Sequence, residues 1–388
     1  MEPDGPSDPK KQGVWKMDTP SSEDILTGIQ EWVKIESPTS DADRVEQMMD
    51  LVSETFKALD CKIERIPGEE GRASHVSVSS PWGGDEKGIL MLSHLDTVHP
   101  VGTIEDLPIR VEGDKAYGPG IYDMKGGAYL GVTAYRTLAE TGWESDLPIR
   151  FLFVSDEETG STTSRKHIEA AGEHAKYVLV TEPARDGGKI VTGRQGSARF
   201  IMRAHGRPAH SGSRHKEGRS AILEMAKQIE RIEGRTDYGR NFTVNVGMIE
   251  GGTAANVIPE HCTASLDFRF RDLGVADEMI SWVQNLDSFS PDVSFSVDGG
   301  MTRPPFEETP AIKDLFDHAK DLAAEIGFEL VGTFTGGGSD GNFLAGKLPV
   351  LDGLGVDGEG AHTLHEHLLI SSLVPRMRLM RRLMETLH

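Results

Sequence analysis

Histidine and acidic side chains recur where this sequence passes from an apolar run into a loop, a place where polar groups from separate segments can meet. They are His94 and Asp96, the pair Glu157 and Glu158, Glu182, His362 and, within the glycine-rich stretch GPGIYDMKGG of residues 118–127, Asp123. Imidazoles and carboxylates form the mixed nitrogen and oxygen ligand set that Zn²⁺ accepts, and a carboxylate left free can move a proton. These residue types indicate metal-assisted hydrolysis.

Each of these residues also has an ordinary structural interpretation. An acid after a strand is often a turn residue, and Asp123 stands directly before a helical pattern, where aspartate is a preferred N-cap. Taken alone, the stretch around Asp123 favours the cap. The ordinary interpretation does not explain why so many such residues should converge on one region.

The elements that must position these residues alternate along the chain. Apolar runs at residues 89–92, 149–154 and 177–180 are typical of strands buried on both faces, and helical patterns cover residues 128–140 and about 164–171. The alternation predicts an α/β fold with a mostly parallel sheet and helices on both faces. In such sheets ligands bind beyond the carboxyl ends of the strands, which is where the residues named above fall.

Counting ligands gives a specific arrangement of two cations. The predicted ligands are His94, His362, Glu158, Glu182 and Asp123. Each cation would take one imidazole, one glutamate and one oxygen of the shared aspartate, and two ions about 3.5–4 Å apart polarise a carbonyl and lower the pKa of an attacking water. Glu157 would be the general base, and Asp96 would orient His94 through its other ring nitrogen.

A change of pattern divides the chain. From about residue 193 the predicted elements follow the order β-α-β-β-α-β, the ferredoxin-like arrangement on an antiparallel sheet, and the α/β pattern resumes at about residue 305. We therefore predict a metal-binding catalytic domain at residues 21–192 and 305–388. An inserted α+β domain would occupy residues 193–304, and residues 1–20 would be a disordered lead.

The acidic excess limits the partners. With 62 acidic and 41 basic residues the formal charge is −21, and such a surface repels nucleic acid and anionic membranes. The first twenty residues lack an apolar signal core and no later run approaches a membrane span, so a cytoplasmic location is expected. The two cysteines, Cys61 and Cys262, lack metal-ligand spacing.

The motifs SHLDTVHP, GPGIYDMKGG, SDEETGSTTSR, TEP and AHTLHE resemble those of the dinuclear zinc exopeptidases and deacylases, which include glutamate carboxypeptidase, acetylornithine deacetylase, succinyl-diaminopimelate desuccinylase and aminoacylase. The resemblance covers nearly the whole chain after the lead, and it is closest to the bacterial glutamate carboxypeptidases. It implies the five ligands named above, a general base at Glu157 and a cis peptide bond after Asp123. The implied cofactor is a pair of divalent ions, with Zn²⁺ favoured and Mn²⁺ or Co²⁺ also accepted.

The resemblance also implies substrate contacts and a dimer. His210 matches a histidine that reaches the partner subunit's active site and stabilises the oxyanion, while Asn256 and Arg303 match positions that meet substrate. The backbone amides around Gly337 could hold an anionic group. The inserted domain would serve as lid and as the contact of a homodimer. The expected substrate is a small carboxylate-bearing amide, such as a dipeptide, an N-acyl amino acid or a C-terminal glutamate conjugate.

Several alternatives stay open. His365 and His367 compete with His362 as the last ligand, and the same metal site could act on another C–N bond, in an aromatic amide or by amine deamination. The sequence GGSDG at residues 337–341 fits a nucleophile elbow and, with a later aspartate and His362, follows the Ser-Asp-His order of an α/β-hydrolase. That alternative leaves most of the acids and His94 without a role. A non-catalytic binding relative would usually lack some ligands, and here all are present.

Overall fold

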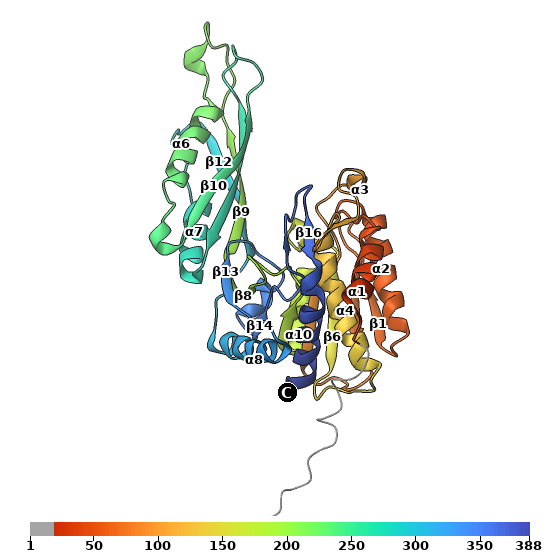
Figure 1. Ribbon diagram of the computed structural model, residues 1–388. Coiled ribbons are helices and arrows are strands. Elements are labelled where there is room, and N and C mark those ends of the chain that lie inside the picture. The colour runs from red at the N-terminus through yellow and green to blue at the C-terminus, as the bar shows by residue number, and fades with distance from the viewer. Residues whose placement is uncertain (1–18) are drawn as a thin grey trace, which may run out of the picture.

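A computed structural model describes residues 19–388 of the chain. The predicted disordered lead at residues 1–20 lies outside the described residues apart from Thr19 and Pro20. Within the described range no helix combines the length and apolarity needed to cross a bilayer. Two larger sheets, each with its own helices, dominate the architecture (Figure 1).

The first of these sheets has six strands in the order β1-β2-β6-β3-β7-β14. Their bounds are β1 Lys62–Ile66, β2 His75–Ser79, β3 Gly88–His94, β6 Ile149–Val154, β7 Ala175–Val180 and β14 Val350–Leu351. Strand β3 pairs in parallel with β6 and β7, and β7 pairs in parallel with β14, whereas β1 and β2 form an antiparallel edge. Every residue of β3 is buried, as expected of a strand in the middle of a covered sheet. The prediction of a mostly parallel sheet is confirmed.

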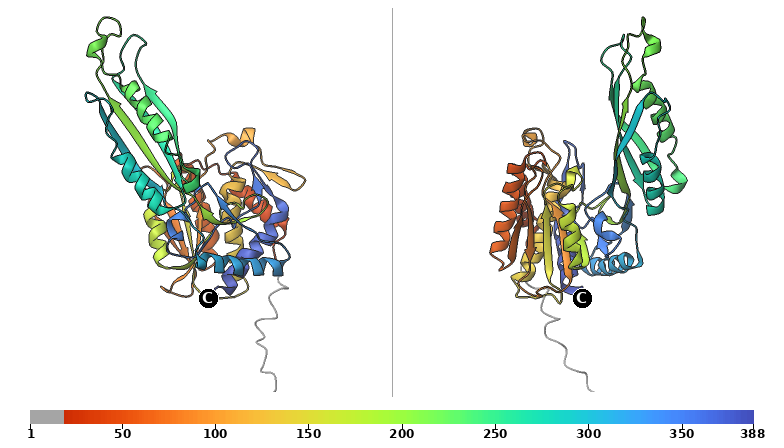
Figure 2. Two further views of the ribbon diagram at one scale, coloured as in Figure 1. Left: turned by 90° about the vertical axis from the view of Figure 1, so that its left-hand side faces the viewer. Right: turned by 180° about the vertical axis from the view of Figure 1, so that it is seen from behind.

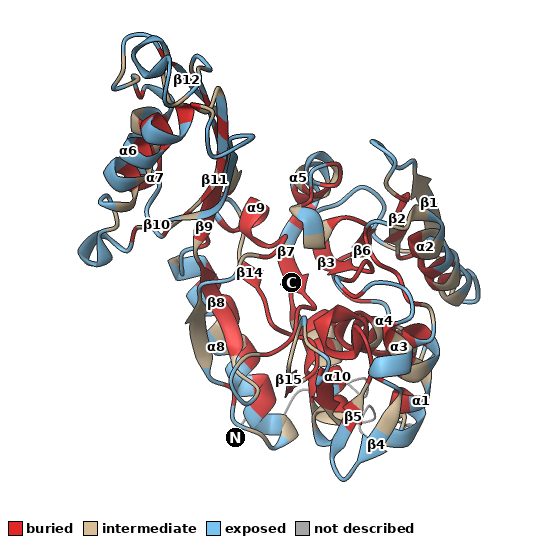
Figure 3. Cartoon of the chain, turned by 90° about the horizontal axis from the view of Figure 1, so that it is seen from above, coloured by how far each residue is buried: buried red, intermediate tan, exposed pale blue. Residues whose placement is uncertain are grey.

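Helices cover both faces of this sheet. They are α1 Ser22–Val33, α2 Ala42–Lys57, α4 Gly126–Ala139, α5 Arg165–Glu173, α8 Pro310–Ile326, α9 Asn342–Ala345 and α10 Leu373–Thr386. Alternate side chains of β3 enter two separate cores: Ile89 and Met91 pack with residues of α1, α2, α4 and α10, and Leu90 and Leu92 pack with residues of α5 and α9. Figure 3 shows β3 and β7 buried and the outer faces of the peripheral helices exposed.

The second sheet has four strands in the order β10-β11-β9-β12, with every neighbouring pair antiparallel. The elements are β9 Gly196–His205, α6 Ala221–Glu233, β10 Thr243–Gly251, β11 His261–Phe270, α7 Leu273–Gln284 and β12 Ser294–Arg303. The β-α-β-β-α-β order is as predicted, and one face of the sheet packs on α6 and α7 while side chains on the other face are exposed. Figures 1 and 2 show this unit projecting from the rest of the chain. Its use as a lid and dimer contact stays a prediction.

Two smaller sheets were not predicted from the sequence. Strand β8, Ile190–Arg194, pairs in parallel with β13, Gly332–Thr335. The other sheet has the order β15-β16-β5-β4 and is formed by β4 Arg110–Glu112, β5 Lys115–Tyr117, β15 Gly358–Glu359 and β16 His367–Leu369, with the one-turn helix α3 Thr103–Asp106 preceding it. Because β16 pairs with β5, the AHTLHE segment lies beside the glycine-rich turn that carries Asp123.

Candidate dinuclear metal centre

The carboxyl ends of three neighbouring strands bring most of the predicted ligands together. His94 is the last residue of β3, Glu157 and Glu158 lie in the turn after β6, and Glu182 lies just beyond β7. Strand β3 lies between β6 and β7, so these loops open at one edge of the sheet. Among the described residues, His94 with Glu157 and Glu182, and His94 with Asp123 and Glu158, form groups whose ligand atoms lie within 4.8 Å of one another.

Asp123 lies between the two predicted histidine ligands. Its Oδ1 atom is 3.4 Å from Nε2 of His94, and its Oδ2 atom is 3.4 Å from Nε2 of His362. The peptide bond from Asp123 to Met124 is cis, as the resemblance implied. The cap interpretation is wrong, because Lys125 is the residue that precedes α4 and Asp123 makes no capping hydrogen bond to that helix. The carboxylate therefore points one oxygen toward each imidazole.

The two glutamates complete the two halves of the cluster. Nε2 of His94 is 3.6 Å from Oε1 of Glu182, and Nε2 of His362 is 3.3 Å from Oε2 of Glu158. Nitrogen and oxygen ligands about 2.0–2.1 Å from one tetrahedral Zn²⁺ are roughly 3.3 Å apart, so these separations match atoms that could share an ion. The alternatives for the last ligand are not brought to the cluster: His365 is exposed, and His367 bonds the His365 carbonyl through Nδ1 and packs against Tyr117.

The cluster carries an excess of buried negative charge, which a bound cation would offset. Oδ1 of Asp123 and Oε1 of Glu158 are buried without a hydrogen-bond donor among the described residues. Burial, with the Asp123 charge, raises the pKa of Glu182 to about 8, while contacts to the Asp123 and Glu158 carboxylates raise the pKa of His362 to about 10. Protons are thus needed to offset the buried negative charge, and divalent ions can replace them. The residues fit a pair of metal ions.

Asp96 positions both His94 and the loop that carries the two glutamates. The carboxylate of Asp96 accepts hydrogen bonds from the backbone N–H groups of Glu157 and Glu158, both at 3.2 Å, and from Oγ1 of Thr39 at 2.6 Å. Nδ1 of His94 lies 2.9 Å from the Asp96 backbone carbonyl and 3.5 Å from its carboxylate. The ring is therefore oriented mainly by the main chain of Asp96, whereas its carboxylate mainly holds the Glu157–Glu158 turn.

Glu366 is a functional residue that the sequence reasoning named only as part of a motif. Its carboxylate is buried and accepts the backbone N–H groups of Gly120, Tyr122 and Asp123, each at 2.9 Å, and Nε2 of His99 lies 2.7 Å from it. These contacts fix the turn that presents Asp123. Its spacing of four residues from His362 was the available signal, but the partners of Glu366 are distant in the sequence.

Arg303 lies beside the proposed general base. Its side chain is 8% exposed, its Nη2 donates to Oε1 of Glu157 at 2.9 Å, and its Nη1 donates to Oδ1 of Asp340 at 2.9 Å. Burial raises the pKa of Glu157 well above its usual value, although the Arg303 charge opposes the rise. Because both ends of the guanidinium fork are occupied, direct binding of a substrate carboxylate would require Arg303 to exchange a partner.

Two further predicted substrate contacts, His210 and Asn256, lie in loops of the four-stranded unit, apart from the cluster at Asp123. Nδ1 of His210 accepts the N–H groups of Gly212 at 3.1 Å and Ser213 at 3.2 Å, so the neutral ring carries its proton on Nε2. The Asn256 carbonyl accepts a hydrogen bond from the Ser211 N–H, which places Asn256 beside this loop. Figure 2 shows the loop after β9 at the free end of the four-stranded sheet.

The segment at residues 337–341 contains both Gly337, a predicted substrate contact, and Ser339, the nucleophile of the serine-hydrolase alternative. A Cβ atom at Gly337 would meet nothing within 4 Å, and the Gly337 carbonyl accepts Nη1 of Arg194 at 3.1 Å. Ser339 is fully buried and its hydroxyl donates to Asp352, which also binds the Arg194 guanidinium. His362 faces carboxylates instead of this serine. The nucleophile-elbow alternative is therefore wrong.

Comparison with known proteins agrees with this geometry. Residues 90–386 match the family described as peptidase family M20/M25/M40. Carboxypeptidase G2 from Pseudomonas sp. (strain RS-16) is 32% identical over 360 residues, which cover 91% of this chain and 86% of that protein. A succinyl-diaminopimelate desuccinylase from Ralstonia pickettii (strain 12J) is 28% identical over 340 residues, which cover 81% of this chain and 86% of the relative.

Solved structures share the fold. The aminopeptidase PepT from Bacillus cereus ATCC 10987 superposes with a TM-score of 0.76 at 23% identity, covering 94% of this chain and 98% of that one. The M20 family metallo-carboxypeptidase Sso-CP2 from Sulfolobus solfataricus gives a TM-score of 0.70 at 16% identity, covering 95% and 99%. These likenesses extend over both larger sheets.

Proposed function

The chain belongs to the peptidase family M20/M25/M40, metal-dependent hydrolases of amide or peptide bonds, and we propose that its Asp123 carboxylate is shared by two divalent cations. The observation that carries the proposal is the placement of one Asp123 oxygen 3.4 Å from His94 and the other 3.4 Å from His362. The first ion would be held by His94, Asp123 and Glu182, and the second by His362, Asp123 and Glu158. Zn²⁺ suits this ligand set best, and Mn²⁺ or Co²⁺ could also occupy it.

The bound ions would polarise the scissile carbonyl and lower the pKa of the attacking water. Glu157 is the proposed general base. One of its carboxylate oxygens lies within 4.8 Å of the ligand atoms of His94 and Glu182, and Arg303 donates to Oε1 at 2.9 Å. From this position Glu157 would accept the proton of the water on a carboxylate oxygen and release it to the leaving nitrogen.

The proposed substrate is a small amide or peptide that carries a free carboxylate. The names of two relatives, a carboxypeptidase and a desuccinylase, support this class. The His362 side chain is 53% exposed, so the cluster is open to solvent on that side and such a molecule could enter there. The amides around Gly337 and the guanidinium of Arg303 are candidate carboxylate contacts, the latter after an exchange of partner.

The proposed assembly is a homodimer formed through the four-stranded unit. His210 lies at the end of this unit with its Nε2–H unused by the loop that holds Nδ1, so it could donate to the oxyanion in the partner's site together with Asn256. Exposed apolar side chains on the unit, among them Leu223, Met248 and Ile249, support a protein contact there.

The test compares Glu157→Gln with Glu173→Gln, a change of an exposed glutamate at the end of α5. With dipeptides and N-acyl amino acids as substrates and Zn²⁺ or Mn²⁺ added, Glu157→Gln is expected to lower kcat by about 10²–10⁴ while metal content stays unchanged. Near wild-type turnover in Glu157→Gln would contradict the mechanism.

The substrate class is tested separately. A panel of dipeptides, N-acyl amino acids and carboxylate-free aromatic amides and amines would be read by mass spectrometry. Cleavage restricted to carboxylate-bearing amides is expected, and cleavage of only the carboxylate-free compounds would overturn this part of the proposal. A chelator should abolish activity in either case.

A further inference from the structure

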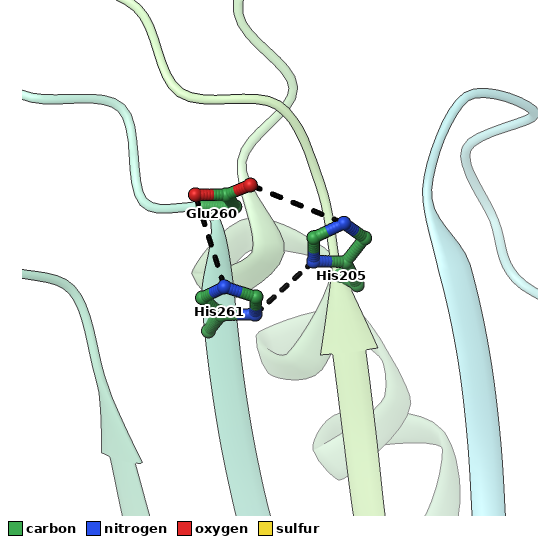
Figure 4. A group of neighbouring side chains, drawn as sticks. All are labelled: His205, Glu260 and His261. Atoms are coloured by element: carbon green, nitrogen blue, oxygen red, sulfur yellow. Dashed lines mark hydrogen bonds and ion pairs between the residues drawn. The ribbon is translucent and has the colours of Figure 1, made fainter.

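Three side chains meet on the solvent-exposed face of the four-stranded sheet, on a unit separate from the cluster at Asp123. His205 is the last residue of β9, His261 is the first residue of β11, and Glu260 precedes His261 (Figure 4). The mechanism proposed above uses none of them. Among the described residues they form a set of possible metal ligands of their own, separate from the two groups that contain His94.

The backbone brings the two histidines together before any ligand binds. His205 and His261 are directly opposite each other in the antiparallel register of β9 and β11. Both are exposed residues in strands of alternating burial, so both side chains project from the face opposite to α6 and α7. The Gly206 N–H donates to the Glu260 carbonyl at 2.7 Å, which fixes the third residue at the end of the same strand pair. Ligands carried on paired strands lose little freedom on binding.

The donor atoms are close enough to share one ion. Nδ1 of His205 is 3.1 Å from Nδ1 of His261, and the Glu260 carboxylate lies 4.0 Å from Nε2 of His205 and 3.7 Å from Nε2 of His261. One donor atom from each residue can be chosen so that all lie within 4.8 Å of one another. Two imidazole nitrogens bound to one Zn²⁺ at about 2.0–2.1 Å are roughly 3.3 Å apart at a tetrahedral angle, close to the observed separation of the Nδ1 atoms.

We propose that His205, Glu260 and His261 form a mononuclear site for a divalent transition metal ion, independent of the cluster at Asp123. Two imidazoles and one carboxylate favour Zn²⁺, Cu²⁺ or Ni²⁺ over Ca²⁺ and Mg²⁺, which prefer oxygen ligands. The side chains are 54%, 41% and 71% exposed, so water completes the coordination and the ion exchanges with solvent. The cation Arg203, two residues before His205, is paired with Asp298 and does not oppose binding there.

The experiment measures zinc stoichiometry in the full chain. The protein is stripped with a chelator and titrated with Zn²⁺ by calorimetry, and bound zinc is counted by elemental analysis after buffer exchange. The variants are His205→Ala, His261→Ala and the double variant, with the exposed His215→Ala as the matched control. The wild type and the control are expected to bind one zinc more than the double variant, and each single variant to lose the same equivalent.

The comparison of zinc stoichiometry between the wild type and the double variant tests this site alone, whatever number of ions the cluster at Asp123 binds. A failure of this proposal can therefore be distinguished from a failure of the proposed function. Hydrolytic activity, and the thermal unfolding temperature of the metal-free protein, should be the same in all variants, because the exchanged side chains are exposed and outside the proposed catalytic residues. Equal zinc stoichiometry and affinity in the wild type and the double variant would overturn the proposal.

Discussion

Replacing Glu366 with glutamine is expected to weaken metal binding, although Glu366 is not itself a proposed ligand. The Glu366 carboxylate accepts three backbone N–H groups of the turn at residues 120–123 and contacts His99. That turn presents Asp123 to both histidines. Glutamine preserves the size of the side chain but removes its charge and one hydrogen-bond acceptor. The turn, and with it the position of the Asp123 carboxylate, should therefore be held less firmly.

The size of the effect follows from counting hydrogen bonds. Oε1 of Glu366 accepts Tyr122 and Asp123, while Oε2 accepts Gly120 and faces His99. If the glutamine oxygen keeps Tyr122 and Asp123, its NH₂ group meets the Gly120 N–H, and a buried donor without an acceptor costs about 1–3 kcal/mol. Loss of the charge on the remaining bonds adds about 1 kcal/mol. A total of about 2–4 kcal/mol corresponds to roughly 30- to 1,000-fold weaker metal affinity.

The assay is competition of the stripped protein with a zinc chelator of known affinity, together with kcat/KM at saturating zinc. Glu359→Gln, an exposed change in neighbouring β15, is the matched control and should leave both quantities unchanged. Zinc affinity and kcat/KM within threefold of the wild type in Glu366→Gln would refute the idea that this carboxylate holds the metal-binding turn.

Two further changes address the assignment of roles. Asp123→Asn should empty both metal positions or disturb their occupancy, and should abolish hydrolysis. If Asp123 were only a helix cap, the same change would lower the free energy of unfolding by about 1 kcal/mol in a thermal unfolding measurement and leave the metal content unchanged. Ser339→Ala should retain kcat within a few-fold and lower the free energy of unfolding by about 1–2 kcal/mol, because the Ser339 hydroxyl donates to Asp352 and accepts the Gly341 N–H at 3.1 Å. Loss of turnover with intact metal content would restore the serine mechanism.

The parts of the site that the sequence predicted are those encoded locally. Apolar runs mark β3, β6 and β7, and in a parallel sheet the residues just beyond the carboxyl ends of such strands must lie at one edge. This rule placed His94, Glu158 and Glu182 near one another without any knowledge of side-chain directions. The β-α-β-β-α-β order of the four-stranded sheet followed from periodicity in the same way.

The parts that sequence reasoning missed depend on long-range pairing. Glu366 bonds N–H groups more than 240 residues away, and β16 meets β5 across a similar separation, so no local pattern records either contact. Strands as short as β5 and β15 carry too few residues to show a period. Arg303 illustrates a different limit: its residue type suggested a substrate carboxylate, but Glu157 and Asp340 are the carboxylates it contacts in the fold.

Anomalous diffraction from crystals of the zinc-loaded protein tests the sharing of Asp123 most directly. The account predicts two peaks about 3.5–4 Å apart, one among His94, Asp123 and Glu182 and the other among His362, Asp123 and Glu158. A single peak in this cluster at saturating zinc, or two peaks that leave Asp123 bound to only one ion, would contradict it.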